Sequence, residues 1–308
     1  MACGLRLLPR QYLLWMMMDH NIPDNFGGLE SEYSSYSRSE ICILPVPFDL
    51  TSSWIKGSDR GPQAIINSSH YVELYDMETD FEVYRRGIHT LKPIQTNSSQ
   101  QMIEKVKQKV LNLIEDKKFV VTLGGEHTVS LGVIEAHLKH YSQLSILHLD
   151  AHTDLRNSYE GNGYSHACVM ARVREYTDKV ISVGIRSMDK SEMSKIIPEN
   201  LFSAHYISEH PNWHDQVITR LDENVYLSLD IDVFDPSVIP STGTPEPGGL
   251  DWFQIVKLLK KVVEKKNLVG FDVVELCPHP EHPASDFTAA KLIYKLLSYI
   301  FSKRRYSQ

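Results

Sequence analysis

Acidic residues and a histidine follow an apolar run near the middle of the chain. The run 145–149 leads into Asp150, and His152 and Asp154 come at every second position after it. Side chains of an extended segment alternate between its two faces, so these three are expected to point the same way. Buried carboxylates at a strand end are costly unless a positive charge compensates them. The spacing therefore predicts a metal site.

Two further apolar runs end in residues of the same kinds. The run 119–123 leads through a Gly-Gly turn to His127, and the run 225–229 leads into Asp230 and Asp232. Any one of these motifs alone is better explained by a solvated turn or a local salt bridge. Together they offer six candidate ligands, four carboxylates and two imidazoles. A structural zinc ion takes four ligands, usually including cysteine, so this set better suits two harder divalent ions that share carboxylates.

Strands that alternate with helices must position these residues. Short β-rich apolar runs predict strands at 41–45, 119–123, 145–150, 180–185, 225–230 and 268–274. Helical signals between them predict helices around 103–114, from Gly61-Pro62, after a cap at Asp251, and over 288–301. The alternation indicates βαβ units and a mainly parallel sheet covered on both faces. Ligands of such sheets bind beyond the carboxyl ends of the strands, where these acids and histidines occur.

Composition bounds the class of protein. The 308 residues, 42% of them hydrophobic, can bury a large core, and no repeat or linker divides residues 18–308, which we predict to form one domain. The balance of 32 basic against 39 acidic residues, a net charge of −7, argues against a nucleic-acid-binding surface. The four cysteines show no C-x-x-C spacing, which predicts a reduced, cytoplasmic protein.

The first residues form a short apolar stretch that Pro9, Arg10 and Gln11 interrupt. The stretch is too short to span a membrane and lacks a secretory cleavage site, so no membrane association is expected. Residues 1–17 are predicted to lie outside the domain. They are either a start-site artefact, with Met18 as the natural start, or a disordered amphipathic extension.

Together, the motifs resemble those of the ureohydrolase family, which includes arginase, agmatinase, guanidinobutyrase and formimidoylglutamase. The matching segments are GGEH at 124–127, DAHTD at 150–154, SHA at 165–167, SLDIDVFDP at 228–236, TGTPEPGGL at 242–250 and DVVEL at 272–276. The resemblance runs in order from about residue 41 to the C-terminus. It implies a three-layer α/β/α domain with a mainly parallel sheet, and a homo-oligomer, a trimer or hexamer.

The resemblance also implies two manganese ions per subunit. One ion would be bound by His127, Asp150, Asp154 and Asp230, and the other by Asp150, His152, Asp230 and Asp232. Asp150 and Asp230 would then bridge the two ions. Such a pair can activate a water molecule for attack on a guanidinium carbon, which is otherwise a poor electrophile.

Three residues are implied to act on the substrate. Asp154 would carry a proton from the attacking water to the leaving amine. His166 matches the proton-shuttle histidine of the family, although without the resemblance a helix-opening residue with no chemical role would be the better interpretation. Glu275 matches the carboxylate that binds the small cationic guanidino substrate in a charge-assisted pair, and its plainer interpretation is a structural salt bridge.

The loop at 155–165 bears on the choice of substrate. It departs from the Asn- and Ser-rich arginase loop that holds an amino-acid head group, and it is similar to the E-G-x-x-Y-S-H-A form of agmatinases. Tyr159 or Glu160 would meet a distal ammonium by cation–π or charge attraction, unless both only decorate a solvated loop. We therefore expect an agmatinase, which converts agmatine and water to putrescine and urea in polyamine biosynthesis.

Other functions remain open at this stage. N1-aminopropylagmatine, which would give spermidine and urea, is the main rival substrate because the sequence does not reveal pocket depth. Guanidinobutyrate follows, with Arg156 as its carboxylate contact, and a formimidoylglutamase would release formamide. A metal-free pseudoenzyme that binds polyamines is a different class, against which the complete ligand set speaks. A zinc deacylase would use a single metal.

Overall fold

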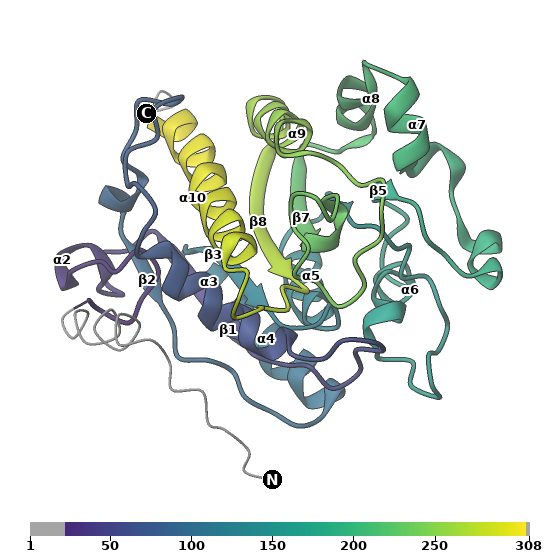
Figure 1. Ribbon diagram of the computed structural model, residues 1–308. Helices are drawn as coiled ribbons and strands as arrows, with labels where there is room; N and C mark the ends of the chain where they lie inside the picture. The colour runs from purple at the N-terminus through teal and green to yellow at the C-terminus, as the bar shows by residue number, and fades with distance from the viewer. Residues whose placement is uncertain (1–21, 306–308) are drawn as a thin grey trace, which may run out of the picture.

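The computed structural model describes residues 22–305, so the predicted extension at 1–17 lies outside the described residues. Eight parallel strands form one sheet in the order β2-β1-β3-β8-β7-β4-β5-β6 (Figure 1). The strands are β1 Ile41–Val46, β2 Ile88–Thr90, β3 Phe119–Gly124, β4 Leu144–Leu149, β5 Val180–Ile185, β6 Leu201–Ser203, β7 Asn224–Asp230 and β8 Asn267–Val274. This arrangement confirms the predicted parallel α/β fold.

Helices pack on both faces of the sheet and make three layers (Figure 1). Strand residues alternate between the two layers: Ile41 and Ile43 join one apolar cluster, while Cys42 and Leu44 join the other. The first cluster includes residues of α3, α8, α9 and α10, and the second includes residues of α4, α5 and α6. The helices are α2 Ser31–Ser34, α3 Gly61–Ser69, α4 Ser99–Glu115, α5 Val129–His140, α6 Val169–Val173, α7 Ala204–Glu209, α8 Trp213–Arg220, α9 Trp252–Lys265 and α10 Ala284–Arg305.

Local signals explain where several helices begin. Pro62 occupies the first turn of α3, where its missing N–H has no helical partner to lose. Asp251 caps α9 as predicted: its Oδ1 accepts from the Gln254 N–H at 2.8 Å, and Gln254 Oε1 accepts from the Asp251 N–H at 2.8 Å. Such caps contribute about 1 kcal/mol each. Helix α10 begins at Ala284, four residues before the predicted 288. Its first turn is polar and contains Asp286, so the apolar pattern used for the prediction did not include that turn.

The carboxyl ends of four neighbouring strands determine where the candidate site lies. Strands β3, β8, β7 and β4 are neighbours in the middle of the sheet, so the residues that follow them meet at one edge. Gly125 follows β3, and a Cβ there would come within 2.1 Å of the Phe48 carbonyl oxygen, so only glycine allows this approach. Asp230 is itself the last residue of β7.

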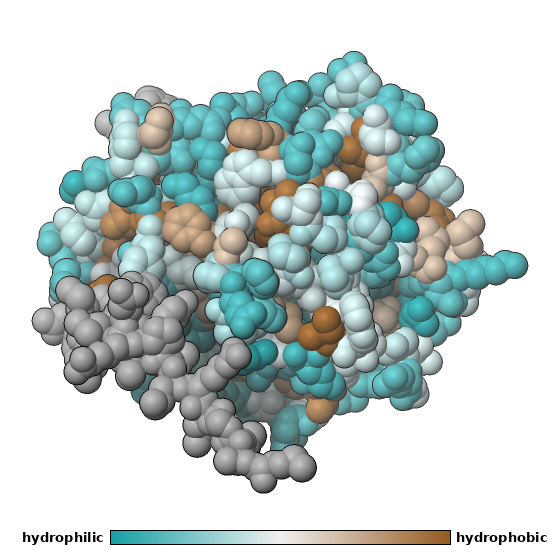
Figure 2. All heavy atoms as spheres, viewed as in Figure 1, coloured by the Kyte–Doolittle hydropathy of each residue, from teal (hydrophilic) through white to brown (hydrophobic). Residues whose placement is uncertain are grey.

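The exterior contrasts with this core. In the view of Figure 2 the hydrophobic residues form small separate patches on a mainly hydrophilic face. Within residues 22–305, no helix is both long and apolar enough to cross a membrane.

The cysteines of the described residues, Cys42, Cys168 and Cys277, are buried free thiols.

Candidate metal centre and active site

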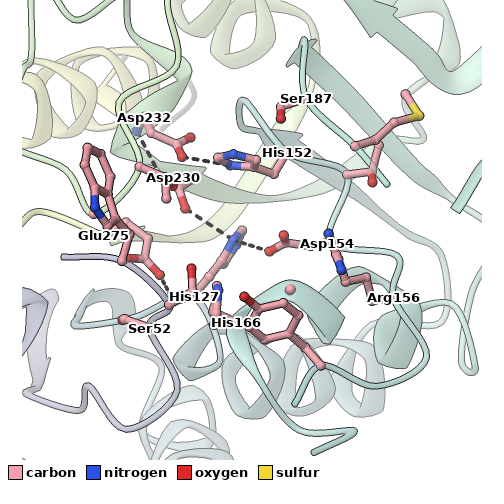
Figure 3. A pocket seen from close by; sticks show the side chains of 18 of the residues that line it. Ser52, His127, His152, Asp154, Arg156, His166, Ser187, Asp230, Asp232 and Glu275 are labelled. Carbon is pink, nitrogen blue, oxygen red and sulfur yellow. Dashed lines mark hydrogen bonds and ion pairs between the residues drawn. The ribbon is translucent and has the colours of Figure 1, made fainter. Parts of the chain in front are cut away.

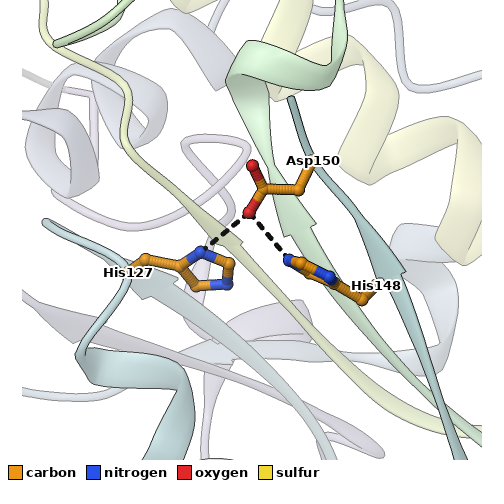
Figure 4. Close-up of side chains that lie close together, drawn as sticks. All are labelled: His127, His148 and Asp150. Atoms are coloured by element: carbon orange, nitrogen blue, oxygen red, sulfur yellow. Dashed lines mark hydrogen bonds and ion pairs between the residues drawn. The ribbon is translucent and has the colours of Figure 1, made fainter. Parts of the chain in front are cut away.

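Asp150 lies at the centre of a buried cluster beyond the end of β4. Its Oδ2 lies 3.1 Å from His127 Nδ1 and 2.7 Å from His148 Nε2 (Figure 4). Its Oδ1 accepts from the His152 N–H at 2.5 Å and lies 3.6 Å from His152 Nδ1. Both oxygens of one carboxylate are therefore engaged, each on a different side of the cluster.

The first predicted ligand set converges on His127. Its Nδ1 lies 3.0 Å from Asp154 Oδ2 and 3.4 Å from Asp230 Oδ2 (Figure 3), in addition to its contact with Asp150 (Figure 4). This Nδ1 is buried and makes no well-formed hydrogen bond. The other ring nitrogen, Nε2, lies 3.1 Å from Ser228 Oγ. If Nε2 carries the proton, the Nδ1 lone pair faces three carboxylates and suits a cation.

The second predicted set lies beside the first. His152 Nδ1 is 3.0 Å from Asp232 Oδ2. Asp232 Oδ1 accepts from the Ala151 N–H at 3.0 Å, which fixes the carboxylate. Asp150 belongs to both sets, whereas Asp230 is joined to the second set through its Oδ1, which accepts from the Asp232 N–H at 2.9 Å.

The local reason for this convergence differs from the predicted alternation along an extended strand. The strand β4 ends at Leu149, and Asp154 has a left-handed backbone with φ of 51°. A buried Glu192 holds this turn, because its Oε1 accepts from Thr153 Oγ1 and from the Leu155 N–H, both at 2.8 Å. The turn, and not the pleat of the strand, brings Asp154 back toward His127.

The donor set fits divalent metal ions. Adjacent ligands at right angles around an ion with bonds of about 2.1 Å lie roughly 3 Å apart, which matches the contacts of His127 and His152. Burial, together with Asp232 and Asp150, raises the pKa of Asp230 well above its usual value. Burial opposes protonation of His152, but Asp150 and Asp232 outweigh it and raise its pKa to about 12. The field in the cluster is strongly negative and favours a cation.

The cluster opens into a cavity of about 270 Å³. Glu275 lines it next to the ligand candidates and stands just after β8 in a left-handed conformation, with φ of 65°. Its Oε1 accepts from the His127 N–H at 2.7 Å. Burial and the neighbouring Glu126 raise the pKa of Glu275 well above its usual value. A cationic group entering the cavity would favour the ionised carboxylate.

His166 and the loop before it form another wall of the cavity (Figure 3). His166 Nδ1 lies 3.2 Å from Thr51 Oγ1, which also accepts from the His166 N–H at 3.0 Å. Thr51 in turn donates to Glu126 Oε1 at 2.7 Å, so Glu126 holds the loop behind His166. The Tyr159 ring meets the His166 ring edge-on at 5.4 Å between centroids. Glu160 is exposed and does not line this cavity.

Comparison with known proteins identifies the family. Residues 39–298 match the model of the arginase family. The chain belongs to the arginase family. It is a ureohydrolase, a hydrolase that acts on guanidino groups, as predicted.

This arginase-family chain is 35% identical over 283 residues to an N(1)-aminopropylagmatine ureohydrolase of Synechocystis sp., covering 88% of this chain and 92% of the relative. It is 31% identical over 264 residues to an agmatinase of Pyrococcus horikoshii, covering 84% of this chain and 91% of the relative. Its fold matches that of an agmatine ureohydrolase of Thermoplasma volcanium with a TM-score of 0.84 and 26% identity, covering 96% of this chain and all of that one.

Several residues of this arginase-family site escaped the sequence prediction. His148 and Ser228 lie inside apolar strands, two positions before Asp150 and Asp230 respectively, so the period of two that marked the ligands would also have marked them. Thr51 and Glu192 contact the site from distant loops, and no local pattern identifies them.

Proposed function

We propose that this ureohydrolase binds two manganese ions and hydrolyses the guanidino group of agmatine, giving putrescine and urea. One observation carries the proposal: two ligand sets that share Asp150 adjoin a single cavity that Glu275 also lines. A carboxylate without a metal ligand role, placed beside a cation-binding cluster, suits a planar cationic substrate.

The residues around Asp150 would hold the ions. His127 and Asp154 would bind one ion, and His152 and Asp232 would bind the other. Asp150 and Asp230 would each help to hold both ions. When bound, two such ions lower the pKa of water and polarise the substrate.

The chain's own side chains would orient the substrate and move the protons. Glu275 would accept hydrogen bonds from the guanidinium, whose charge compensates the buried carboxylate. Asp154 would take a proton from the attacking water and give it to the departing amine. His166 lies on the cavity wall with one ring nitrogen held by Thr51, which leaves the other for proton exchange with the cavity.

The second candidate substrate is N1-aminopropylagmatine, which would yield spermidine and urea. A relative of that name is 35% identical to this chain. The cavity also has aromatic and apolar lining residues, including Trp54, of which 70% is exposed, and Met188, of which 38% is exposed. Such surfaces suit the methylene chain and the distal ammonium of a longer polyamine.

Tyr159 and Arg156 bear on the remaining alternatives. Both line the cavity, and the Arg156 guanidinium lies 5.1 Å from the centre of the Tyr159 ring. Arg156 therefore already covers one face of the Tyr159 ring, so a distal ammonium, as proposed for agmatine, would have to meet the other face, while Arg156 is the group that guanidinobutyrate would need. We propose no substrate contact for Glu160.

A urea-release assay on manganese-loaded protein tests the proposal. Agmatine, N1-aminopropylagmatine, arginine and guanidinobutyrate would be compared by kcat/KM, with metal content measured in parallel. We expect two manganese ions per chain and the highest kcat/KM with agmatine, or with N1-aminopropylagmatine if the second candidate holds. Absence of urea from all four compounds would refute the proposal and favour a polyamine-binding pseudoenzyme. Light scattering of the same sample would test the proposed homo-oligomer.

A further inference from the structure

A row of polar side chains crosses the sheet below the proposed metal ligands. Ser182 on β5, His148 on β4, Ser228 on β7 and Asp272 on β8 are direct register partners. His148, Ser228 and Asp272 are each 0% exposed. Polar groups inside a sheet are costly unless they are paired, so this row requires an explanation.

Two members of the row, Ser228 and Asp272, have hydrogen-bond partners close to His127. Ser228 Oγ donates to Asp272 Oδ1 at 3.0 Å, and Tyr226 donates to Asp272 Oδ2 at 2.6 Å. With its hydrogen committed to Asp272, Ser228 Oγ accepts from His127 Nε2. These contacts account for Ser228 and Asp272 and leave the roles of His148 and its neighbour Ser182 to be explained.

The contacts of His148 define its tautomer. Its Nε2 lies 2.7 Å from Asp150 Oδ2, and its Nδ1 lies 3.1 Å from Ser182 Oγ. An ionised carboxylate only accepts hydrogen bonds, so Nε2 carries the proton and donates it to Asp150. In the neutral ring Nδ1 then accepts from the Ser182 hydroxyl. The chain of contacts runs from Ser182 through His148 to the carboxylate.

This contact restrains the carboxylate that both ligand sets share. Asp150 Oδ2 accepts from His148, and Oδ1 accepts from the His152 backbone N–H at 2.5 Å. Each carboxylate oxygen has two lone pairs, so one lone pair on each oxygen remains for a metal ion. Rotation of the carboxylate would break both hydrogen bonds. His148 therefore sets the plane in which Asp150 can bridge.

We propose that His148 is a positioning residue that holds Asp150 in the orientation needed to bind two ions at once. The inference rests on the proposed two-metal function and adds a residue outside the ligand set. His148 is not itself assigned as a ligand, because its Nε2 is directed at Asp150 at hydrogen-bond distance and its Nδ1 at Ser182. Loss of a group that orients a ligand typically weakens metal affinity about 10- to 100-fold.

Three substitutions separate this role from general packing. His148→Phe keeps a planar ring but removes the donor, whereas His148→Gln retains an amide N–H that can reach Asp150. His214→Phe is the matched control, because His214 is also buried, at 5% exposed, but its Nε2 contacts the Gln254 carbonyl oxygen at 3.2 Å, on another part of the fold.

The measurement is a manganese titration of the full-length, metal-depleted chain, followed by calorimetry and by electron paramagnetic resonance of the coupled ion pair. We expect His148→Phe to weaken at least one ion about 10- to 100-fold and to lose the coupled signal at limiting manganese. His148→Gln should recover most of the affinity, and His214→Phe should match the wild type. A kcat that falls in His148→Phe and recovers with excess manganese, at unchanged KM, would support the same role.

Two results would overturn the inference in different ways. If the wild type binds two ions and His148→Phe binds both with equal affinity, His148 has no positioning role and the proposed function stands. If the wild type binds fewer than two ions, the proposed function fails and the inference fails with it. Should His148→Phe not fold, Ser182→Ala provides the decision: it should weaken the same ion several-fold, and wild-type affinity in that variant would refute the role.

Discussion

At the scale of single residues, shared contacts distinguish the acids of the site. Asp150 is engaged by histidines at both oxygens, and its loss would disturb both ligand sets. The carboxylate of Asp232 contacts His152 and the Ala151 N–H, on the His152 side of the cluster. The two acids are therefore expected to have separable effects on metal content, which makes Asp232 the more informative residue to replace.

Asp232→Ala should remove one ion and spare the other. The variant loses the carboxylate 3.0 Å from His152 Nδ1, while the set around His127 keeps all of its members. We expect about one manganese per chain by elemental analysis and a turnover lower by more than about 100-fold, since a lost ligand should exceed the effect of a lost orienting group. Asp222→Ala, at a surface ion pair with Lys179, is the control. Two ions and an unchanged rate would refute the ligand assignment.

Glu275→Gln should affect the substrate and not the metals. The amide oxygen can still accept from the His127 N–H, so the local shape is kept while the charge is lost. We expect kcat/KM for the preferred guanidino substrate to fall roughly 10²- to 10³-fold, the order of about 3–4 kcal/mol for a buried charge pair. Metal content by elemental analysis should not change. Unaltered kcat/KM would leave Glu275 with a structural role only.

At the scale of elements, the sequence predicted those strands that are buried in the sheet. All six predicted strands are present with ends within one residue of the prediction, because a parallel strand covered on both faces reads as a continuous apolar run. The structure adds β2 and β6, which the prediction missed. These are three-residue strands at the two edges of the sheet, too short and too mixed in burial to show a period.

The candidate site, like the strands, could be predicted where its residues stand at the ends of apolar runs, but not elsewhere. Acids that end apolar runs are conspicuous, so the candidate ligands were found from sequence. His148 was missed because it lies within such a run, and Thr51 because its contact with His166 joins residues 115 positions apart. Contacts of that range depend on how the loops pack, which a local pattern does not determine.

Helix α5 supplies a prediction about pH. His137 of α5 is fully buried against β8; its Nδ1 lies 2.9 Å from the Val133 carbonyl oxygen, and Gly270 of β8 leaves the space for its ring. Burial lowers the pKa of His137 to about 4. A lowered histidine pKa means that folding excludes a proton, so the contribution to stability is present above about pH 6.5 and is lost as pH falls toward 4.

Replacing His137 with leucine should therefore reduce the acid sensitivity of folding. Between pH 7 and 4.5 we expect the free energy of unfolding of the wild type, measured with urea, to fall by about 2 kcal/mol more than that of His137→Leu. His205→Leu is the control, since that side chain is 83% exposed. Equal losses in the wild type and His137→Leu would show that His137 does not titrate in this range.

At the scale of the whole molecule, the proposed metal centre lies over the middle of the sheet. The ligand candidates follow β3, β4 and β7, and Glu275 follows β8, so the four central strands all contribute to one cluster. Both apolar cores pack against these same strands. Binding of ions at the cluster should therefore be linked to the stability of the entire fold and not to one loop.

Metal removal should lower the temperature of unfolding. The acids around Asp230 are buried close together. Burial is the largest cause of the raised Asp230 pKa, and repulsion from the neighbouring carboxylates is the next largest. Each ion that binds only the folded chain stabilises it by about 2.7 kcal/mol at a hundredfold excess over Kd, which corresponds to a shift of roughly 4 °C per ion for a chain of 308 residues. Scanning calorimetry with manganese and with a chelator would measure the shift. Asp232→Ala, with one ligand set broken, should show a smaller one. If the wild type unfolds at the same temperature in both conditions, the acids are not balanced by bound ions, and the cluster does not couple metal binding to folding.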